Sequence, residues 1–146
     1  MKRFHFRLDK VLEWYTRQYE EEERRLAACL AALAEAHRAM AALQVERLKV
    51  EKDVVSQAQI AARDFVALGL YRLGVRKQEA ELDEARARCE SDVEAQRGRL
   101  QEAQRRVRLL EKLRGRRLAE HSYAEGRELE ELASDAYFAK WAAGGG

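Results

Sequence analysis

The chain has 146 residues, 37% of them charged, and it contains no proline. Its 28 basic and 26 acidic residues leave a formal net charge of +2. A nucleic-acid-binding domain is usually plainly basic, so this balance does not indicate a nucleic-acid-binding protein. A sequence without proline that is rich in Ala, Glu, Arg and Leu is typical of long helices. We therefore expect one elongated helical domain over residues 1–146 instead of a globule.

Residues 2–7, KRFHFR, form a short aromatic and basic segment at the start of the chain. They have no uninterrupted apolar core and no small-residue cleavage site, so they do not predict a secretory signal. No run of the chain approaches the roughly 18 consecutive apolar residues that indicate a transmembrane helix. We therefore expect a cytoplasmic protein without a transmembrane segment.

Apolar residues then recur with a period of about 3.5, which is typical of helices that supercoil around a partner. Alternating steps of four and three give 14 positions, of which only Glu22 and Arg47 are not apolar. We call this line the first seam, and it predicts a helix over residues 4–56. Its positions are Leu8, Leu12, Tyr15, Tyr19, Glu22, Leu26, Cys29, Leu33, Ala36, Met40, Leu43, Arg47, Val50 and Val54.

A second seam with the same period appears when residues are counted backward from Leu110. Ten of its 14 positions are apolar, which predicts a second helix over residues 65–140. The positions are Leu110, Val107, Ala103, Leu100, Gln96, Val93, Cys89, Arg86, Leu82, Glu79, Val75, Arg72, Leu68 and Phe65.

The connection between the two helices has two candidate positions. Gly69 and Gly74 could mark a turn within residues 69–74, because glycine interrupts helices. The second seam passes through both glycines without using either, which favours a turn within residues 56–64. Asp64 is then a candidate N-cap of the second helix. The last residues, 142–146, have no side chains that pack well, and we expect them to be disordered.

Together the two seams predict an all-α, elongated, antiparallel two-helix coiled-coil hairpin. With a turn near residue 60, opposed residue numbers add up to about 120, and Cys29 then lies close to the level of Cys89. In a reducing compartment both cysteines are expected to pack as small apolar residues. The first helix ends its pairing near residue 117, so residues from 118 onward have no predicted partner in the chain.

No group of residues in the sequence indicates catalysis. His5, His37 and His121 show no metal-ligand spacing, and the glycines lack the lysine and serine of a phosphate-binding loop. The carboxylates are spread along helices, whereas acid–base catalysis needs them together in a pocket. We therefore expect a protein that is not an enzyme and that binds no cofactor and no metal.

Two stretches hold more basic or more apolar residues than the pairing of a coiled coil requires. Residues 105–117, RRVRLLEKLRGRR, hold seven basic residues and one acidic residue, and they read either as a solvated face or as a dock for an acidic partner. Residues 65–75 hold Val66, Leu70, Tyr71 and Leu73 outside the second seam. This apolar excess indicates either a binding site or local packing of the turn.

Three segments of the sequence resemble the FliJ family of flagellar export proteins. The opening, MKRFHFRLDKVLEW, resembles the family's start of alternating phenylalanines followed by L-x-x-V-L. The stretch AARDFVALGLYRLGVRKQEAEL at 61–82 is similar to the family segment that follows the turn. The third segment, VRLLEKLRGRRLAEHSYAEGRELEELASDAY at 107–137, resembles the family's basic L-E-K-L-R stretch and the charged run after it.

The resemblance implies a non-catalytic component of flagellar type III protein export. It would act as a coiled-coil stalk that inserts into the export ATPase hexamer and links it to the membrane export-gate protein and to escort chaperones. It would lie peripherally on the cytoplasmic side of the membrane at the flagellar base, with no nucleic acid as a partner. The alternatives are a generic structural coiled-coil spacer and a basic nucleic-acid-binding hairpin.

The resemblance also implies two sets of contact residues. The residues expected to contact the export gate or chaperones are Leu68, Tyr71 and Val75. The residues expected to contact the ATPase ring are Phe4, Phe6, Leu8, Leu110, Leu113, Arg114, Arg116 and Arg117.

Overall fold

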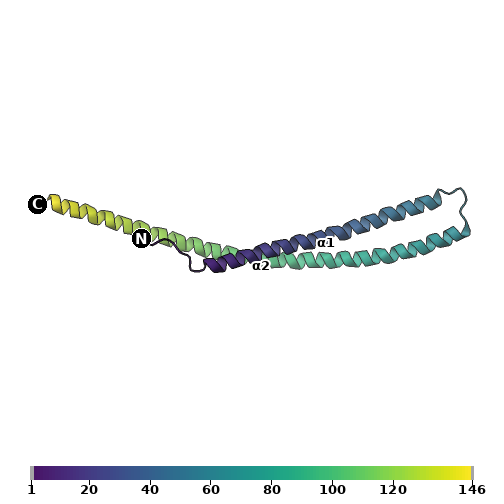
Figure 1. Cartoon of the computed structure of the whole chain (residues 1–146), viewed down its shortest axis with the longest axis horizontal. Helices are drawn as coiled ribbons and strands as arrows, with labels where there is room; N and C mark the ends of the chain where they lie inside the picture. The colour runs from purple at the N-terminus through teal and green to yellow at the C-terminus, as the bar shows by residue number, and fades with distance from the viewer. Residues whose placement is uncertain (1, 146) are drawn as a thin grey trace. The chain divides into compact units, whose positions relative to one another are not determined.

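The structure, a computed structural model, describes residues 2–145 and contains two helices, α1 (Asp9–Val55) and α2 (Ala62–Gly144). The described residues hold no strand. Their contacts group into two units, a terminal unit of residues 2–20 and 102–145 and a turn unit of residues 21–101. In each unit α1 and α2 lie side by side and run in opposite directions (Figure 1). The predicted all-α two-helix hairpin is confirmed.

The first seam is the face that α1 turns toward α2. All 14 of its positions are buried or half-buried, and Leu43 is the most deeply buried of them. A period of 3.5 keeps one narrow line of side chains in contact with a partner helix over this length. The sequence pattern therefore identified the packed face of α1 correctly.

The second seam differs from its prediction near the turn. Twelve of its 14 positions are buried or half-buried, but Phe65 and Arg72 are exposed. Asp64 and Tyr71 are half-buried in their place. The packed face steps by four twice in succession, from Glu79 to Val75 and from Val75 to Tyr71, which locally raises the period above 3.5. A strict alternation of three and four could not have followed this shift.

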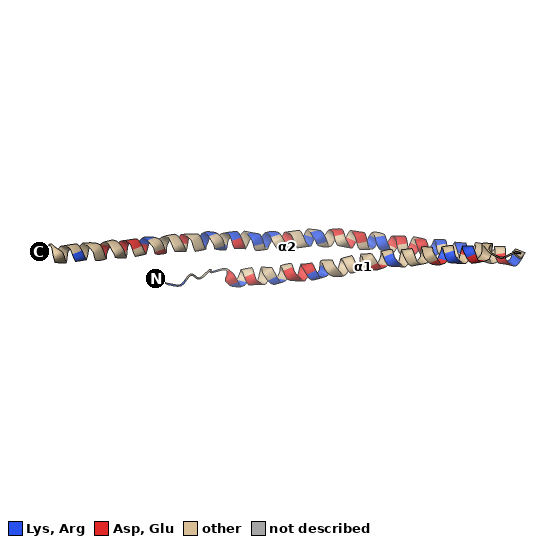
Figure 2. Cartoon of the chain, turned by 90° about the horizontal axis from the view of Figure 1, so that it is seen from above, with Lys and Arg blue, Asp and Glu red and all other residues tan. Residues whose placement is uncertain are grey.

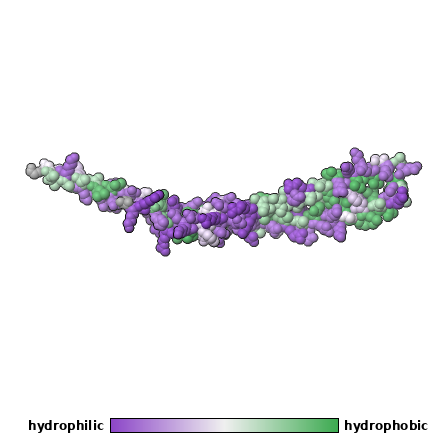
Figure 3. Space-filling view, in the orientation of Figure 1, coloured by the Kyte–Doolittle hydropathy of each residue, from purple (hydrophilic) through white to green (hydrophobic). Residues whose placement is uncertain are grey.

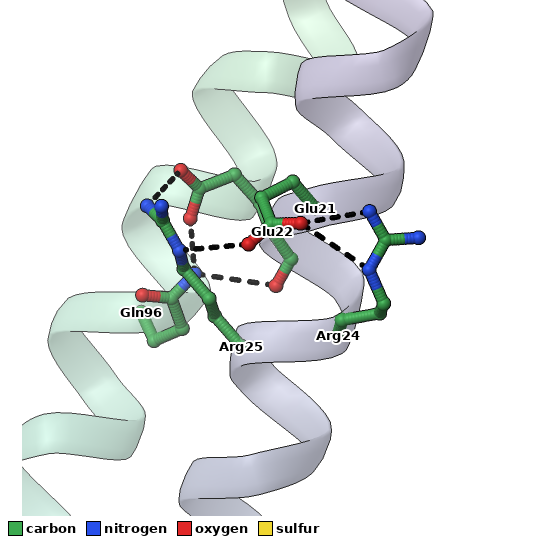
Figure 4. A network of polar contacts seen from close by, with 5 residues as sticks. All are labelled: Glu21, Glu22, Arg24, Arg25 and Gln96. Carbon is green, nitrogen blue, oxygen red and sulfur yellow. Dashed lines mark hydrogen bonds and ion pairs between the residues drawn. The ribbon is translucent and has the colours of Figure 1, made fainter.

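Four of the six polar residues that interrupt the two seams meet in pairs across the hairpin. Gln96, which is almost fully buried, donates its amide to the Glu22 carboxylate and to the Glu22 backbone carbonyl (3.2 Å) (Figure 4). Arg47 donates to the Glu79 carboxylate at 3.3 Å, and Gln44 donates to the same oxygen at 2.9 Å. A shift of one helix along the other would leave these polar groups against apolar partners, so the pairs help to fix the register.

Charged side chains on α1 surround the Glu22–Gln96 contact. Arg25 lies 3.3 Å from the Glu22 carboxylate, and Arg24 lies 2.7 Å from that of Glu21 (Figure 4). The hydrogen bond from Arg24 and its charge lower the pKa of Glu21. These pairs are three residues apart and mostly exposed, so they support the helix locally more than they hold the hairpin together.

The connection between the helices comprises residues 56–61, inside the range 56–64 and before the two glycines. Beyond Val55 the Ser56 hydroxyl donates to the Asp53 carbonyl at 2.9 Å, an alternative to continued helical bonding. On the other side, the Ala61 carbonyl accepts from the amides of Asp64 and Phe65. Asp64 is therefore inside the first turn of α2 and is not its N-cap, although its charge suits the helix N-terminus.

Two predicted helix boundaries were wrong. The first helix begins at Asp9 instead of residue 4, because Phe4, Phe6 and Leu8 repeat with the period of two that suits extended backbone. The second helix continues to Gly144, through residues expected to be disordered. Ala142 and Ala143 are strong helix formers and need no packing partner to extend a helix.

By length and composition, α1 is also apolar enough to cross a membrane, with a mean hydropathy of 1.4 over its most apolar 18 residues. This window contains charged residues, so it is not one of the uninterrupted apolar runs on which the sequence prediction rests. Only 6% of the window is buried in the structure, and a single helix of this kind is weak evidence for a membrane span. In the structure the packed face of α1 lies against α2.

Seam burial can be tested with one pair of valines on α2. Val93 is 5% exposed and Val66 is 65% exposed. We expect Val93→Ala to lower the free energy of unfolding by about 1–2 kcal/mol, because it removes two buried carbons. Urea unfolding followed by circular dichroism measures this difference. Val66→Ala serves as the control, and its effect should stay within about 0.5 kcal/mol. Equal losses in the two variants would contradict the assigned seam.

Candidate functional site

The N-terminal residues 2–8 form a strap that packs against α2 within the terminal unit (Figure 1); residues 2–6 lie outside helix and strand, and Arg7 and Leu8 form a turn into α1. Phe6 is 4% exposed, and Phe4 and Leu8 on either side of it are half-buried. His5 and Arg7 between them are exposed. Alternate side chains of an extended segment point to opposite sides, so the strap buries its apolar residues and leaves its basic ones in solvent.

Specific contacts tie the strap and the start of α1 to α2. The Phe4 ring meets the His121 ring edge-on, with centroids 5.5 Å apart, and the Arg114 guanidinium lies 5.7 Å from the Phe4 centroid. Arg114 also donates to the Asp9 carboxylate at 3.3 Å. His121 Nε2 lies 3.0 Å from the Lys2 carbonyl, which can only accept, so this nitrogen carries the hydrogen. Arg114 therefore links the strap, α1 and α2.

A hollow of about 900 Å³ lies between the strap and α2. Four cationic side chains line it, those of Lys2, Arg3, Arg7 and Arg117, with Glu120 as the one acidic residue. Apolar surface comes from Phe4, Phe6, Leu8 and Leu113. A hollow with this combination suits a partner that presents carboxylates next to apolar side chains.

All eight residues expected to contact an ATPase ring lie in the terminal unit. Phe6 is buried, and five others are half-buried where α2, the strap and α1 pack together: Phe4, Leu8, Leu110, Leu113 and Arg114. Arg116 and Arg117 are exposed. The structure thus brings the set together, but only these two arginines present a fully accessible surface.

The basic run of residues 105–117 is seen as mostly blue ribbon on α2 beside the start of α1 (Figure 2). Arg105 and Arg106 pair with Glu102, and Arg117 pairs with Glu120. Leu109 lies within this run and is 69% exposed. Leu109 is not among the predicted contact residues, although its position off the second seam indicates that it faces outward.

The three residues expected to contact the export gate lie on the packed face of α2. Leu68 and Val75 are buried and Tyr71 is half-buried. The Tyr71 hydroxyl is buried without a hydrogen-bond partner among the described residues. Burial raises the pKa of Tyr71, and the nearby charges of Glu46 and Glu51 raise it further. A partner could reach Leu68 and Val75 only if the helices moved apart, whereas part of the Tyr71 side chain is accessible.

Exposed apolar residues surround the turn and form what we call the turn patch. Figure 3 shows hydrophobic surface gathered around the end of the turn unit that holds the connection. The patch comprises Val55, Phe65, Val66, Leu70 and Leu73, each more than half exposed. These residues, and not Leu68 or Val75, form the accessible apolar surface of this region.

The described residues give no indication of a metal or redox centre. No group of three His, Cys, Asp or Glu side chains within residues 2–145 is placed to hold a metal ion. Cys29 and Cys89 are half-buried free thiols on their respective seams. The candidate surfaces among the described residues are the strap with its hollow, the basic run and the turn patch.

Comparison of the chain with protein-family models, curated proteins and solved structures found no match.

The strap can be tested by proteolysis. Phe6→Ala removes its one buried side chain, so we expect trypsin to cleave after Arg7 at least several times faster than in the wild type. Cleavage rates are measured by mass spectrometry under native conditions. His5→Ala is the control, because His5 is exposed and its loss should leave the rate unchanged. Equal cleavage of Phe6→Ala and the wild type would show that the strap is not held by Phe6.

The Tyr71 hydroxyl can be separated from its ring. Tyr71→Phe removes a buried hydroxyl that has no partner among the described residues, so we expect the melting temperature to stay the same or rise. Tyr71→Ala also removes the half-buried ring and should lower the melting temperature. Thermal unfolding followed by circular dichroism measures both. A clear loss of stability in Tyr71→Phe would indicate that the hydroxyl has a stabilising contact.

Proposed function

We propose that this protein is a non-catalytic component of flagellar type III protein export. It acts as a coiled-coil stalk whose terminal unit enters the ring of the export ATPase. The observation that carries the proposal is the strap: the opening MKRFHFRLDKVLEW, which resembles the FliJ family, is packed on the basic stretch that also carries the resemblance. The two most family-like segments of the sequence thus form one surface.

The chemistry of this surface supports insertion into a ring. Its accessible groups are the cations of the hollow together with Arg116, and its apolar residues are already held in place by Phe6 and Arg114. A preformed surface loses little conformational entropy when it binds. An acidic ring lumen would attract it over a range of about 8–10 Å at physiological salt.

The turn patch is the proposed contact with the export-gate protein and with escort chaperones. The family resemblance directs this contact to Leu68, Tyr71 and Val75, which lie on the packed face. We therefore assign the first encounter to their exposed neighbours, above all Phe65, Leu70 and Leu73. Large exposed apolar side chains rimmed by polar ones are typical of protein-binding surfaces.

Two other functions fit parts of the molecule. A structural spacer would need the paired helices but would not need the strap or its hollow. A nucleic-acid-binding hairpin would use the basic run of 105–117, where Leu109 is exposed but no aromatic residue is available to stack on bases. The strap favours the export function over both.

The test is stimulation of purified flagellar export ATPase by the full chain. We expect the variant Arg116→Glu/Arg117→Glu to need about tenfold more protein for half-maximal stimulation, which corresponds to a binding loss of about 1.4 kcal/mol. The matched control is Arg97→Glu/Arg99→Glu, which reverses two exposed arginines of α2 in the turn unit and should leave stimulation unchanged.

The outcomes separate the candidate functions. Unchanged stimulation by Arg116→Glu/Arg117→Glu would contradict ring insertion through this surface. A wild-type chain that neither binds nor stimulates the ATPase would favour the spacer. Binding to random duplex DNA that weakens steeply as salt rises would favour the nucleic-acid-binding function.

A further inference from the structure

The C-terminal part of α2 carries large apolar side chains that contact no other helix. Every described residue from 122 to 145 is exposed, and Trp141 reaches 70% exposure. We call residues 122–144 the overhang. In Figure 1 the N-terminal segment reaches only the start of the overhang, and no other segment lies beside the part of it toward the C-terminus. Its apolar side chains are those of Tyr123, Leu129, Leu132, Tyr137, Phe138 and Trp141.

The overhang is acidic and follows the basic run on the same helix after four intervening residues. Residues 122–144 hold five acidic and two basic residues, whereas residues 105–117 hold one acidic and seven basic residues. Both segments belong to one uninterrupted helix, so they cannot face each other within a chain. They can face each other when two copies of α2 lie antiparallel.

One exposed line of α2 is complementary to itself in such a pair. Its residues are spaced by four or seven positions, which places them on one face of the helix. The line is symmetric about Tyr123, so an antiparallel copy opposes basic residues with acidic or aromatic ones. The residues are Arg105, Leu109, Arg116, Tyr123, Glu130, Tyr137 and Trp141, and all of them are exposed.

The opposed pairs on this line are chemically favourable. Arg116 meets Glu130 as an ion pair, and Leu109 meets Tyr137 as an apolar contact. Arg105 meets Trp141, the aromatic residue that attracts a guanidinium most strongly. Tyr123 meets the Tyr123 of the other copy at the symmetry axis. The residues of α2 that pack on α1 and the strap, such as Leu110 and Leu113, are not on this line.

We infer that two copies of this chain associate through this face of α2, antiparallel and with two-fold symmetry about Tyr123. Residues 105–141 span 37 positions, which corresponds to roughly 55 Å of helix and a contact of about 20 residues a side. A two-fold interface of this kind is closed and stops at the dimer. A membrane surface is disfavoured as occupant, because the overhang lacks the Lys- and Arg-rich polar face of interfacial helices.

This inference does not rest on the proposed export function, and its test needs no export component. Single cysteines are placed in the full chain after Cys29→Ala and Cys89→Ala, and a short bismaleimide is added. Tyr123→Cys should cross-link to itself, because that position lies on the axis. Arg116→Cys and Glu130→Cys should each fail to cross-link alone but should cross-link when mixed. Efficient cross-linking of Glu130→Cys alone would indicate parallel pairing and would overturn the inference.

The strength of association gives a second measurement. Sedimentation equilibrium of the wild type should show dimers at roughly 100 µM, the range expected of an interface of modest affinity. Tyr137→Ala/Trp141→Ala should raise the dissociation constant about tenfold or more, because both large contacts are lost. Phe138→Ala, one residue off the line, should change it by less than about twofold. A wild type that stays monomeric would overturn the inference and would assign the overhang to an unlike partner.

Discussion

The structure depends on the contact between two narrow helical seams. A face one residue wide cannot bury itself, so α1 is stable only against α2, and the connection at residues 56–61 makes that partner part of the same chain. Apolar residues supply most of the driving force, while Glu22 with Gln96 and Arg47 with Glu79 make the register specific. That register determines which side chains are packed between the helices and which stay exposed to a partner.

The surfaces proposed for binding lie where the seams end. At the terminal unit, α1 begins at Asp9 and the strap continues the packing on α2 as extended chain, which leaves cations around a hollow. At the turn, the packed face shifts by one position and leaves Phe65 exposed next to Leu70 and Leu73, which lie outside the seam. A regular coiled coil would provide neither surface, because its apolar residues would all be used for pairing.

The overhang differs from the paired region because its side chains do not pack between α1 and α2. Its aromatic residues are not needed by the hairpin, and the charge of residues 122–144 is opposite to that of residues 105–117. Self-association through α2 and ring insertion would use neighbouring surfaces of the terminal unit, since Arg116 belongs to both. Dimer formation would therefore compete with ring binding, and the balance between them would depend on protein concentration and salt.

The sequence by itself determined the all-α hairpin, the packed face of α1 and a connection before Gly69, because hydrophobic period is a local property that supercoiling preserves. Only the tertiary structure decided which residues are accessible. Tyr71 lies on the packed face and Phe65 does not, because two successive steps of four residues change the face of α2 that meets α1. The start of the chain lies outside α1, and its Phe6 side chain is buried within the terminal unit. The accessibility of each side chain depends on what lies opposite it in space, and the hydrophobic period of a sequence does not specify that.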